Sequence, residues 1–126
     1  MFSESDLSED EFLCGRLRLL QPLKGYRAAT DPVLLAAACP ARTGDSVLDL
    51  GCGVGAAALC LGLRVPGLAL CGLELQPDYA DLARRNADRN GIPLEVHAAD
   101  IARMPKPLRR DFDHVIANPP YYPAGG

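Results

Sequence analysis

The sequence predicts an α/β fold in which repeated strand–helix units build a parallel sheet. From residue 46 onward, short apolar runs alternate with helical patterns, and glycine or proline marks most of the changes. This alternation is typical of βαβ units, which bind ligands at the carboxyl ends of their strands. The chain has 126 residues, enough for one domain, and its 48% apolar and 23% charged residues are ordinary for a globular protein. This composition disfavours intrinsic disorder, collagen and a coiled coil.

Two segments precede these units. Residues 1–11 contain five acidic side chains and no basic one, so we expect a disordered acidic tail. Residues 12–45 form an N-terminal segment, in which an irregular or short β stretch is followed by a helix. We expect this helix to begin at Thr30-Asp31-Pro32, because Thr30 or Asp31 can cap its first N–H groups and a proline fits the first turn.

The strand–helix units themselves occupy residues 46–126. We expect strands over residues 46–50, 68–73, 94–98 and 112–117. We expect helices over residues 56–63 and 77–90, the second opened by Pro77 and ended by Gly91. The residues that follow the strands should therefore gather at one edge of the sheet.

A glycine-rich turn follows the first of these strands, in the stretch Asp49-Leu-Gly51-Cys-Gly53-Val-Gly55. Glycines there let the backbone approach a ligand closely, and the next helix presents free N–H groups. Glu74 ends the next strand, where a carboxylate can accept both hydroxyls of a ribose. The dinucleotide fingerprint is GxGxxG, whereas this turn is GxGxG, and the preceding carboxylate of Asp49 would repel a pyrophosphate. The pattern therefore favours the cationic cofactor S-adenosylmethionine over NAD.

A third acidic residue, Asp100, comes just past the third expected strand. Acids after three successive strands match a nucleoside cofactor that lies across three strand ends. In this interpretation Asp100 accepts a hydrogen bond from the adenine amino group, and Ile101 lies against the ring. The alternative is that Asp100 only caps the turn that follows it.

The fourth expected strand runs into the loop Asn118-Pro119-Pro120-Tyr121. Two prolines fix φ and remove two N–H donors, so the carbonyl groups remain as preset acceptors. The Asn118 side chain adds another acceptor, and Tyr121 adds an aromatic face. These groups suit a planar substrate with an NH2 group, such as a flipped nucleobase. Catalysis would then consist mainly of alignment and electrostatics.

Other sequence signals exclude several classes. The five cysteines contain no CxxC pair and the two histidines lack ligand spacing, so we expect no metal site, and buried thiols in the reducing cytoplasm. No apolar run reaches the ~18 residues of a membrane span, and we expect no membrane partner. The formal charge of −3 is concentrated in residues 1–11, so it does not exclude a nucleic-acid partner.

Four features together resemble the class I S-adenosylmethionine-dependent amino-methyltransferases: the turn from Asp49 to Gly55, Glu74, Asp100 and the loop from Asn118 to Tyr121. In that family the loop binds the substrate amine, in adenine-N6 methylases and in enzymes that methylate a release-factor glutamine. The segment from Gln21 to Ala36 is similar to the one before the glycine turn in the tRNA(Val) adenine-N6 methyltransferases. The resemblance implies a Rossmann-like enzyme that uses S-adenosylmethionine and acts on adenine N6 in tRNA.

The resemblance also implies a role for each matching residue. Asp49, Gly51 and Gly53 would hold the methionine end of the cofactor, near Thr30 and Asp31. Glu74 would bind the ribose, and Asp100 with Ile101 would bind the adenine. In the substrate loop, Asn118 and Pro119 would orient the amine and Tyr121 would stack on its ring. Pro120 belongs to the same candidate catalytic set as the second proline that fixes the loop backbone.

One departure from the family is large. The family's sheet has seven strands, whereas we expect four before the end of this chain, so the Rossmann-like sheet is truncated after about the fourth strand. The edge of that strand would lie open and invite self-association. Three interpretations remain: an adenine-N6 methyltransferase acting on tRNA, a protein glutamine N5-methyltransferase, and an inactive cofactor-binding fragment that lacks the C-terminal half.

Overall fold

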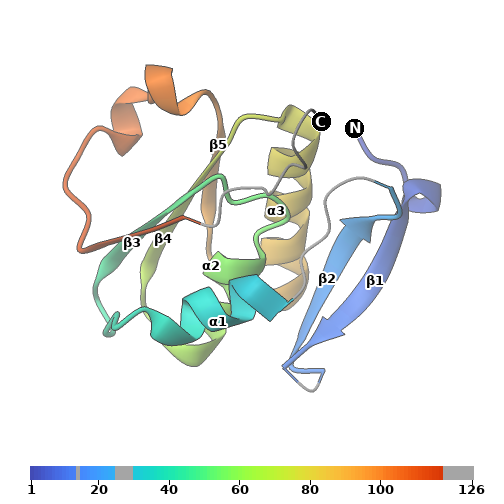
Figure 1. Cartoon of the computed structure of the whole chain (residues 1–126), viewed down its shortest axis with the longest axis horizontal. Helices are drawn as coiled ribbons and strands as arrows, with labels where there is room; N and C mark the ends of the chain where they lie inside the picture. Colours follow the sequence, from blue (N-terminus) through green and yellow to red (C-terminus); the bar gives the residue numbers. More distant parts are fainter. Residues whose placement is uncertain (14, 25–29, 118–126) are drawn as a thin grey trace.

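A parallel sheet forms the centre of the molecule in the computed structural model, which describes residues 1–13, 15–24 and 30–117 (Figure 1). The sheet has four strands in the order β5-β4-β3-β6. The strands are β3 (Ser46–Leu50), β4 (Ala69–Glu74), β5 (Glu95–Ala98) and β6 (His114–Ala117). All three neighbouring pairs are parallel. The expected α/β fold and its four strands are therefore confirmed.

Three helices lie on one side of this sheet, as Figure 1 shows: α1 (Thr30–Ala38), α2 (Ala56–Arg64) and α3 (Pro77–Asn90). Each begins where the sequence predicts it. The chain leaves α3 at Gly91, whose φ of 64° lies in the left-handed region that glycine adopts without strain. No helix among the described residues is both long and apolar enough to cross a membrane.

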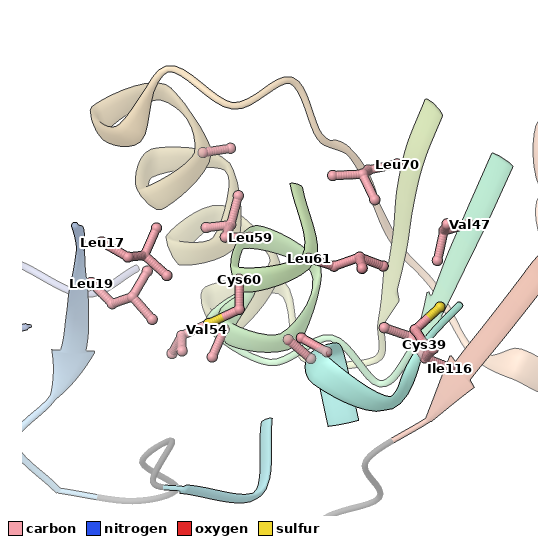
Figure 2. Close-up of a cluster of buried hydrophobic side chains, with 14 of the residues drawn as sticks. Leu17, Leu19, Cys39, Val47, Val54, Leu59, Cys60, Leu61, Leu70 and Ile116 are labelled. Carbon is pink, nitrogen blue, oxygen red and sulfur yellow. The ribbon is translucent and has the colours of Figure 1, made fainter. Parts of the chain in front are cut away.

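Helix α2 is the centre of the main core. Its residues from Ala56 to Leu61 are all buried, because it lies between the sheet, α1 and the N-terminal strands. Figure 2 shows Leu59 and Cys60 directed toward side chains of β2, while Leu61 points toward the sheet. The Leu59 and Leu61 side chains are 0% exposed. The same packing places the start of α2 against the sheet edge where the glycine turn lies.

The other side of the sheet is covered by the segment that follows β5, drawn in orange at the left of Figure 1. It contains the short 3-10 helices η2 (Ile101–Arg103) and η3 (Lys106–Leu108). Leu108 is 1% exposed and packs in a second cluster with Leu48, Cys71 and Leu73 of the sheet. The buried Leu108 side chain therefore anchors this segment to the sheet.

The N-terminal residues correct one expectation, since residues 1–11 are not a disordered tail. They form the 3-10 helix η1 (Glu4–Asp6) and most of β1 (Leu7–Phe12), which pairs antiparallel with β2 (Leu17–Pro22). The prediction was wrong because the acidic side chains have partners: Glu9 pairs with Arg89, and Glu11 lies 3.2 Å from Arg18. Apolar side chains of β2 then bury the hairpin against α2 and α3.

Strand β6 lies at one edge of the sheet and, within the described part of the chain, pairs only with β3. Its Val115 side chain is 56% exposed. An unpaired strand edge with an exposed apolar residue can pair with another chain. Self-association through β6 remains a proposal.

Candidate functional site

The predicted site residues lie on segments that reach the carboxyl edge of the sheet. Leu50, which precedes the glycine turn, is the register partner of Leu73 in β4. Glu74 is the register partner of Ala98 in β5, and its carbonyl accepts a 3.0 Å hydrogen bond from the Ala99 N–H. The parallel register therefore brings together the segments that carry Asp49, Glu74 and Asp100, as expected from the sequence.

The glycine turn is fastened to the end of β4 by backbone hydrogen bonds. The Leu73 carbonyl accepts bonds from the N–H groups of Gly51 at 2.7 Å and Cys52 at 3.0 Å. Gly51 has a φ of 71° and Gly53 a φ of 55°, values that favour glycine because a side chain would be strained there. A Cβ atom added to Gly51 would meet nothing within 4 Å, so its outer side is open. The turn is thus fixed from behind and accessible to a ligand from outside.

Asp49 is a buried carboxyl group at this turn. It is 1% exposed, and its Oδ1 has no hydrogen-bond partner among the residues that the structure describes. Burial raises the pKa of Asp49 to about 7, the backbone N–H of Ala58 opposes that rise, and the negative charge of Glu74 adds to it. A buried acceptor without a donor is costly, so an N–H or O–H group of a ligand would stabilise it.

The Glu74 carboxylate is oriented by two backbone donors. Its Oε1 accepts a 2.9 Å hydrogen bond from the Gly53 N–H, and its Oε2 accepts one of 2.9 Å from the Gln76 N–H. A carboxylate oxygen can accept more than one hydrogen bond. Both Glu74 oxygens therefore keep acceptor capacity for a pair of hydroxyl groups.

Asp100 has the capping role that the sequence offered as an alternative. Its Oδ1 accepts a 3.0 Å hydrogen bond from the Ala102 N–H, so it does cap helix η2. This cap fixes an exposed carboxyl group just beyond the Glu74 backbone. Ile101 next to it is 58% exposed, which leaves its side chain free to contact a planar ring.

Two further groups of predicted residues come from other segments of the chain. Thr30 and Asp31 begin α1, and Asp31 is exposed, with no hydrogen bond or ion pair from its side chain to the residues that the structure describes. The predicted substrate loop, Asn118-Pro119-Pro120-Tyr121, lies outside the described residues. The residue before it, Ala117, is the register partner of Leu50, so β6 ends at the same edge of the sheet.

Residues 29–125 match the family model described as the methyltransferase small domain. The chain belongs to this family. The membership confirms the resemblance to methyltransferases that the sequence motifs indicate.

Two curated relatives of this methyltransferase domain are named for different substrates. The tRNA1(Val) (adenine(37)-N6)-methyltransferase of Yersinia enterocolitica is 34% identical over 99 residues, which are 76% of this chain and 39% of that protein. The release factor glutamine methyltransferase of Chlorobaculum tepidum is 33% identical over 94 residues, 71% of this chain and 32% of that protein. The chain therefore spans roughly a third of the length of these relatives.

Solved structures share the fold of this methyltransferase domain. The tRNA (uracil-54, C5)-methyltransferase of Pyrococcus abyssi, in complex with S-adenosyl-L-homocysteine, matches 91% of this chain and 28% of its own, with a TM-score of 0.69 and 21% identity. TrmN from Thermus thermophilus matches 71% of this chain and 27% of its own, with a TM-score of 0.61 and 30% identity. Both matches show that this chain shares the fold of these solved structures.

Cys52 lies inside the turn of this methyltransferase domain but is not a reactive thiol. Burial raises its pKa well above the usual value, and the charges of Asp49 and Glu74 raise it further. Its sulfur also fills the space beside Gly72, where an added Cβ would lie only 2.9 Å from Sγ. Cys52 is therefore a packing residue, as the cysteine pattern predicts.

Sequence reasoning missed Asn86, a polar residue of α3 that is 0% exposed. A signal was present, because Asn86 stands at the helical spacing of the apolar residues Tyr79, Leu82 and Ala83. A polar residue at such a position must find hydrogen-bond partners in the core. Its partners include the glycine turn.

Proposed function

We propose that this chain forms the cofactor-binding half of an S-adenosylmethionine-dependent N-methyltransferase whose substrate is the N6 amine of adenine in tRNA. The observation that carries the proposal is the buried Asp49 oxygen without a donor, next to a glycine turn that Glu74 helps to fix. Membership of the methyltransferase small domain family supports the reaction class. The Yersinia relative supports the substrate.

The residues present fit this cofactor chemically. S-adenosylmethionine has an ammonium group, a sulfonium charge and two ribose hydroxyls, and it supplies an electrophilic methyl group when it is bound. Asp49 is a buried acceptor whose ionised form a nearby positive charge would stabilise. Glu74 offers the spare acceptor positions that two hydroxyls need. Asp100 and Ile101 would contact the adenine.

The substrate side of the proposal concerns Asn118, Pro119, Pro120 and Tyr121. Their side-chain and backbone acceptors would hold an exocyclic NH2 group and direct its lone pair away from the ring. No strong base is needed, because the nitrogen proton becomes acidic once the nitrogen is methylated. Catalysis would come from alignment and fixed dipoles. Tyr121 would stack on the base.

A second candidate substrate is the side-chain amide of a protein glutamine. The Chlorobaculum relative favours it, with nearly the same identity to this chain as the Yersinia relative has.

We place the protein in the cytoplasm, which the buried free thiols Cys39, Cys52, Cys60 and Cys71 support. We further propose residues 12–45 as an N-terminal segment and residues 46–126 as the partial methyltransferase domain.

The first test is calorimetric titration of the chain with S-adenosylmethionine, with NAD as the competing cofactor and Asp49→Ala as the variant. We expect saturable binding of S-adenosylmethionine alone, and its loss in the folded variant. A chain that is folded by circular dichroism and binds neither cofactor would contradict the proposal.

The substrate is tested by methyl transfer from radiolabelled S-adenosylmethionine to tRNA or to a purified release factor. Transfer to tRNA supports the first candidate, and transfer to the release factor supports the second. Binding without transfer to either would favour the third interpretation, a cofactor-binding fragment without turnover.

A further inference from the structure

The side-chain amide of Asn86 joins three parts of the molecule that are distant in sequence. Its Oδ1 accepts a 2.7 Å hydrogen bond from the Leu20 N–H of β2. Its Nδ2 donates to the Leu20 carbonyl at 3.0 Å and to the Val54 carbonyl at 2.9 Å. Val54 stands between Gly53 and Gly55, so one buried amide links α3, the N-terminal hairpin and the glycine turn.

Asn90, one helical turn further along α3, repeats half of this arrangement. Its Oδ1 accepts a 3.0 Å bond from the Arg18 N–H, and its Nδ2 donates to the Arg18 carbonyl at 2.8 Å. The repeat is geometrically natural, because four residues of helix rise about 6 Å and two residues of strand about 6.6 Å. The two asparagines therefore pair with the edge of β2 as a neighbouring strand would.

The glycine turn is held differently on its two sides. On the sheet side, the N–H groups of Gly51, Cys52 and Gly53 donate to β4. On the α3 side, the Asn86 side chain donates a hydrogen bond to the carbonyl of Val54, a residue that is 1% exposed. Without this donor, the buried Val54 carbonyl would lose its partner and the turn would gain freedom to move.

We propose that Asn86 is a positioning residue for the cofactor site, and that the N-terminal hairpin helps to preorganise the glycine turn through it. The inference rests on the proposed function, since it concerns the affinity of the same site. A side chain on α3 can hold the hairpin without contacting the turn, as Asn90 does through its two bonds to Arg18. The bond from Asn86 to Val54 is therefore not needed for holding the hairpin alone. A fully buried amide with all three bonds satisfied fixes one relative position of hairpin, helix and turn.

The matched variants are Asn86→Ala and Asn90→Ala, which both remove a bidentate contact to β2 while only the first removes the bond to Val54. Calorimetric titration with S-adenosylmethionine is carried out at a temperature where circular dichroism shows both variants folded. We expect Asn86→Ala to raise the Kd roughly tenfold or more and Asn90→Ala to leave it within about twofold, although both lower the Tm. Equal Kd values in the two variants would overturn the inference.

A second readout needs no cofactor and separates this inference from the proposed function. Hydrogen exchange of the Gly55 N–H, which donates to the Cys52 carbonyl at 2.8 Å, reports opening of the turn. We expect exchange to become roughly tenfold faster in Asn86→Ala and to stay unchanged in Asn90→Ala. If the unmodified chain binds no S-adenosylmethionine but exchange follows this pattern, the proposed function fails while the coupling stands.

Should Asn86→Ala fail to fold, the smaller perturbation Asn86→Ser and the unmodified chain still decide the question. In the unmodified chain, coupling predicts that the N–H groups of Leu20 and Gly55 exchange through openings of similar free energy as denaturant is added. A Gly55 N–H that opens independently of the Leu20 N–H would overturn the inference.

Discussion

Replacing Asp49 by asparagine removes an ionisation from the core while keeping the shape of the side chain. The pKa of Asp49 is about 7 in the folded chain against a model-peptide value of 3.8, because burial disfavours the charged form. Between these two values the folded chain holds a proton that the unfolded chain has lost. The free energy of unfolding must therefore fall as the pH rises through this window.

The magnitude follows from the size of the shift. One pKa unit corresponds to about 1.4 kcal/mol. From pH 5 to the folded pKa of about 7 is about two units, so the free energy of unfolding should fall by roughly 3 kcal/mol between pH 5 and pH 8. Solvent screening does not reduce it much, since Asp49 is 1% exposed. Asp49→Asn has no such titration. Its stability relative to the unmodified chain should therefore rise by roughly 3 kcal/mol from pH 5 to pH 8.

The assay is urea denaturation of both chains at pH 5, 6, 7 and 8, with Asp88→Asn as a control that changes an exposed carboxylate on α3. We expect the Asp88→Asn difference to stay nearly constant over this range. A difference between Asp49→Asn and the unmodified chain that does not change with pH, or that changes in the opposite direction, would refute the reasoning.

Three further predictions concern other parts of the structure. Glu74→Gln leaves one carbonyl oxygen where two carboxylate oxygens accept backbone N–H groups, so the Kd for S-adenosylmethionine in calorimetry should rise at least about tenfold. Leu108→Ala leaves a cavity in the cluster on the loop-covered face and should lower the free energy of unfolding in urea by about 2–4 kcal/mol. An unchanged midpoint of urea denaturation would show that the loop does not stabilise the sheet. Val115→Lys places a charge on the β6 edge, so any concentration-dependent association in sedimentation should weaken, and unchanged association would exclude that edge.

Most of the sheet and its helices can be predicted from local sequence signals. Pro77 opens α3 and Gly91 ends it because proline and glycine act through their own backbone geometry, which needs no knowledge of the rest of the fold. The alternation of strands and helices then determines the parallel sheet, and with it the edge at which Asp49 and Glu74 meet. The positions of these two residues near the ends of successive strands were sufficient to predict this placement.

The remaining features depend on partners that are far away in sequence. The acidic residues of β1 look unfavourable for a strand until Arg18 and Arg89 are seen to pair with them. Asn86 reads as an isolated polar residue in a helix until Leu20 and Val54 supply its hydrogen bonds. Such long-range pairs leave only a weak trace in one sequence, which explains why the hairpin and its link to the turn were not predicted.

The fastening of the glycine turn to β4 has a consequence for the order of folding. The acceptors for Gly51, Cys52 and Gly53 all belong to Leu73 and Glu74, so the turn cannot complete its hydrogen bonds within its own strand–turn–helix unit. Parallel pairing of β3 with β4 must come first, and such non-local pairing is slow compared with helix formation. During synthesis on a ribosome, a chain that has emerged only as far as α2 therefore carries an unfastened turn. A small molecule that binds the completed turn would therefore stabilise the assembled β3–β4 pair rather than the first unit alone.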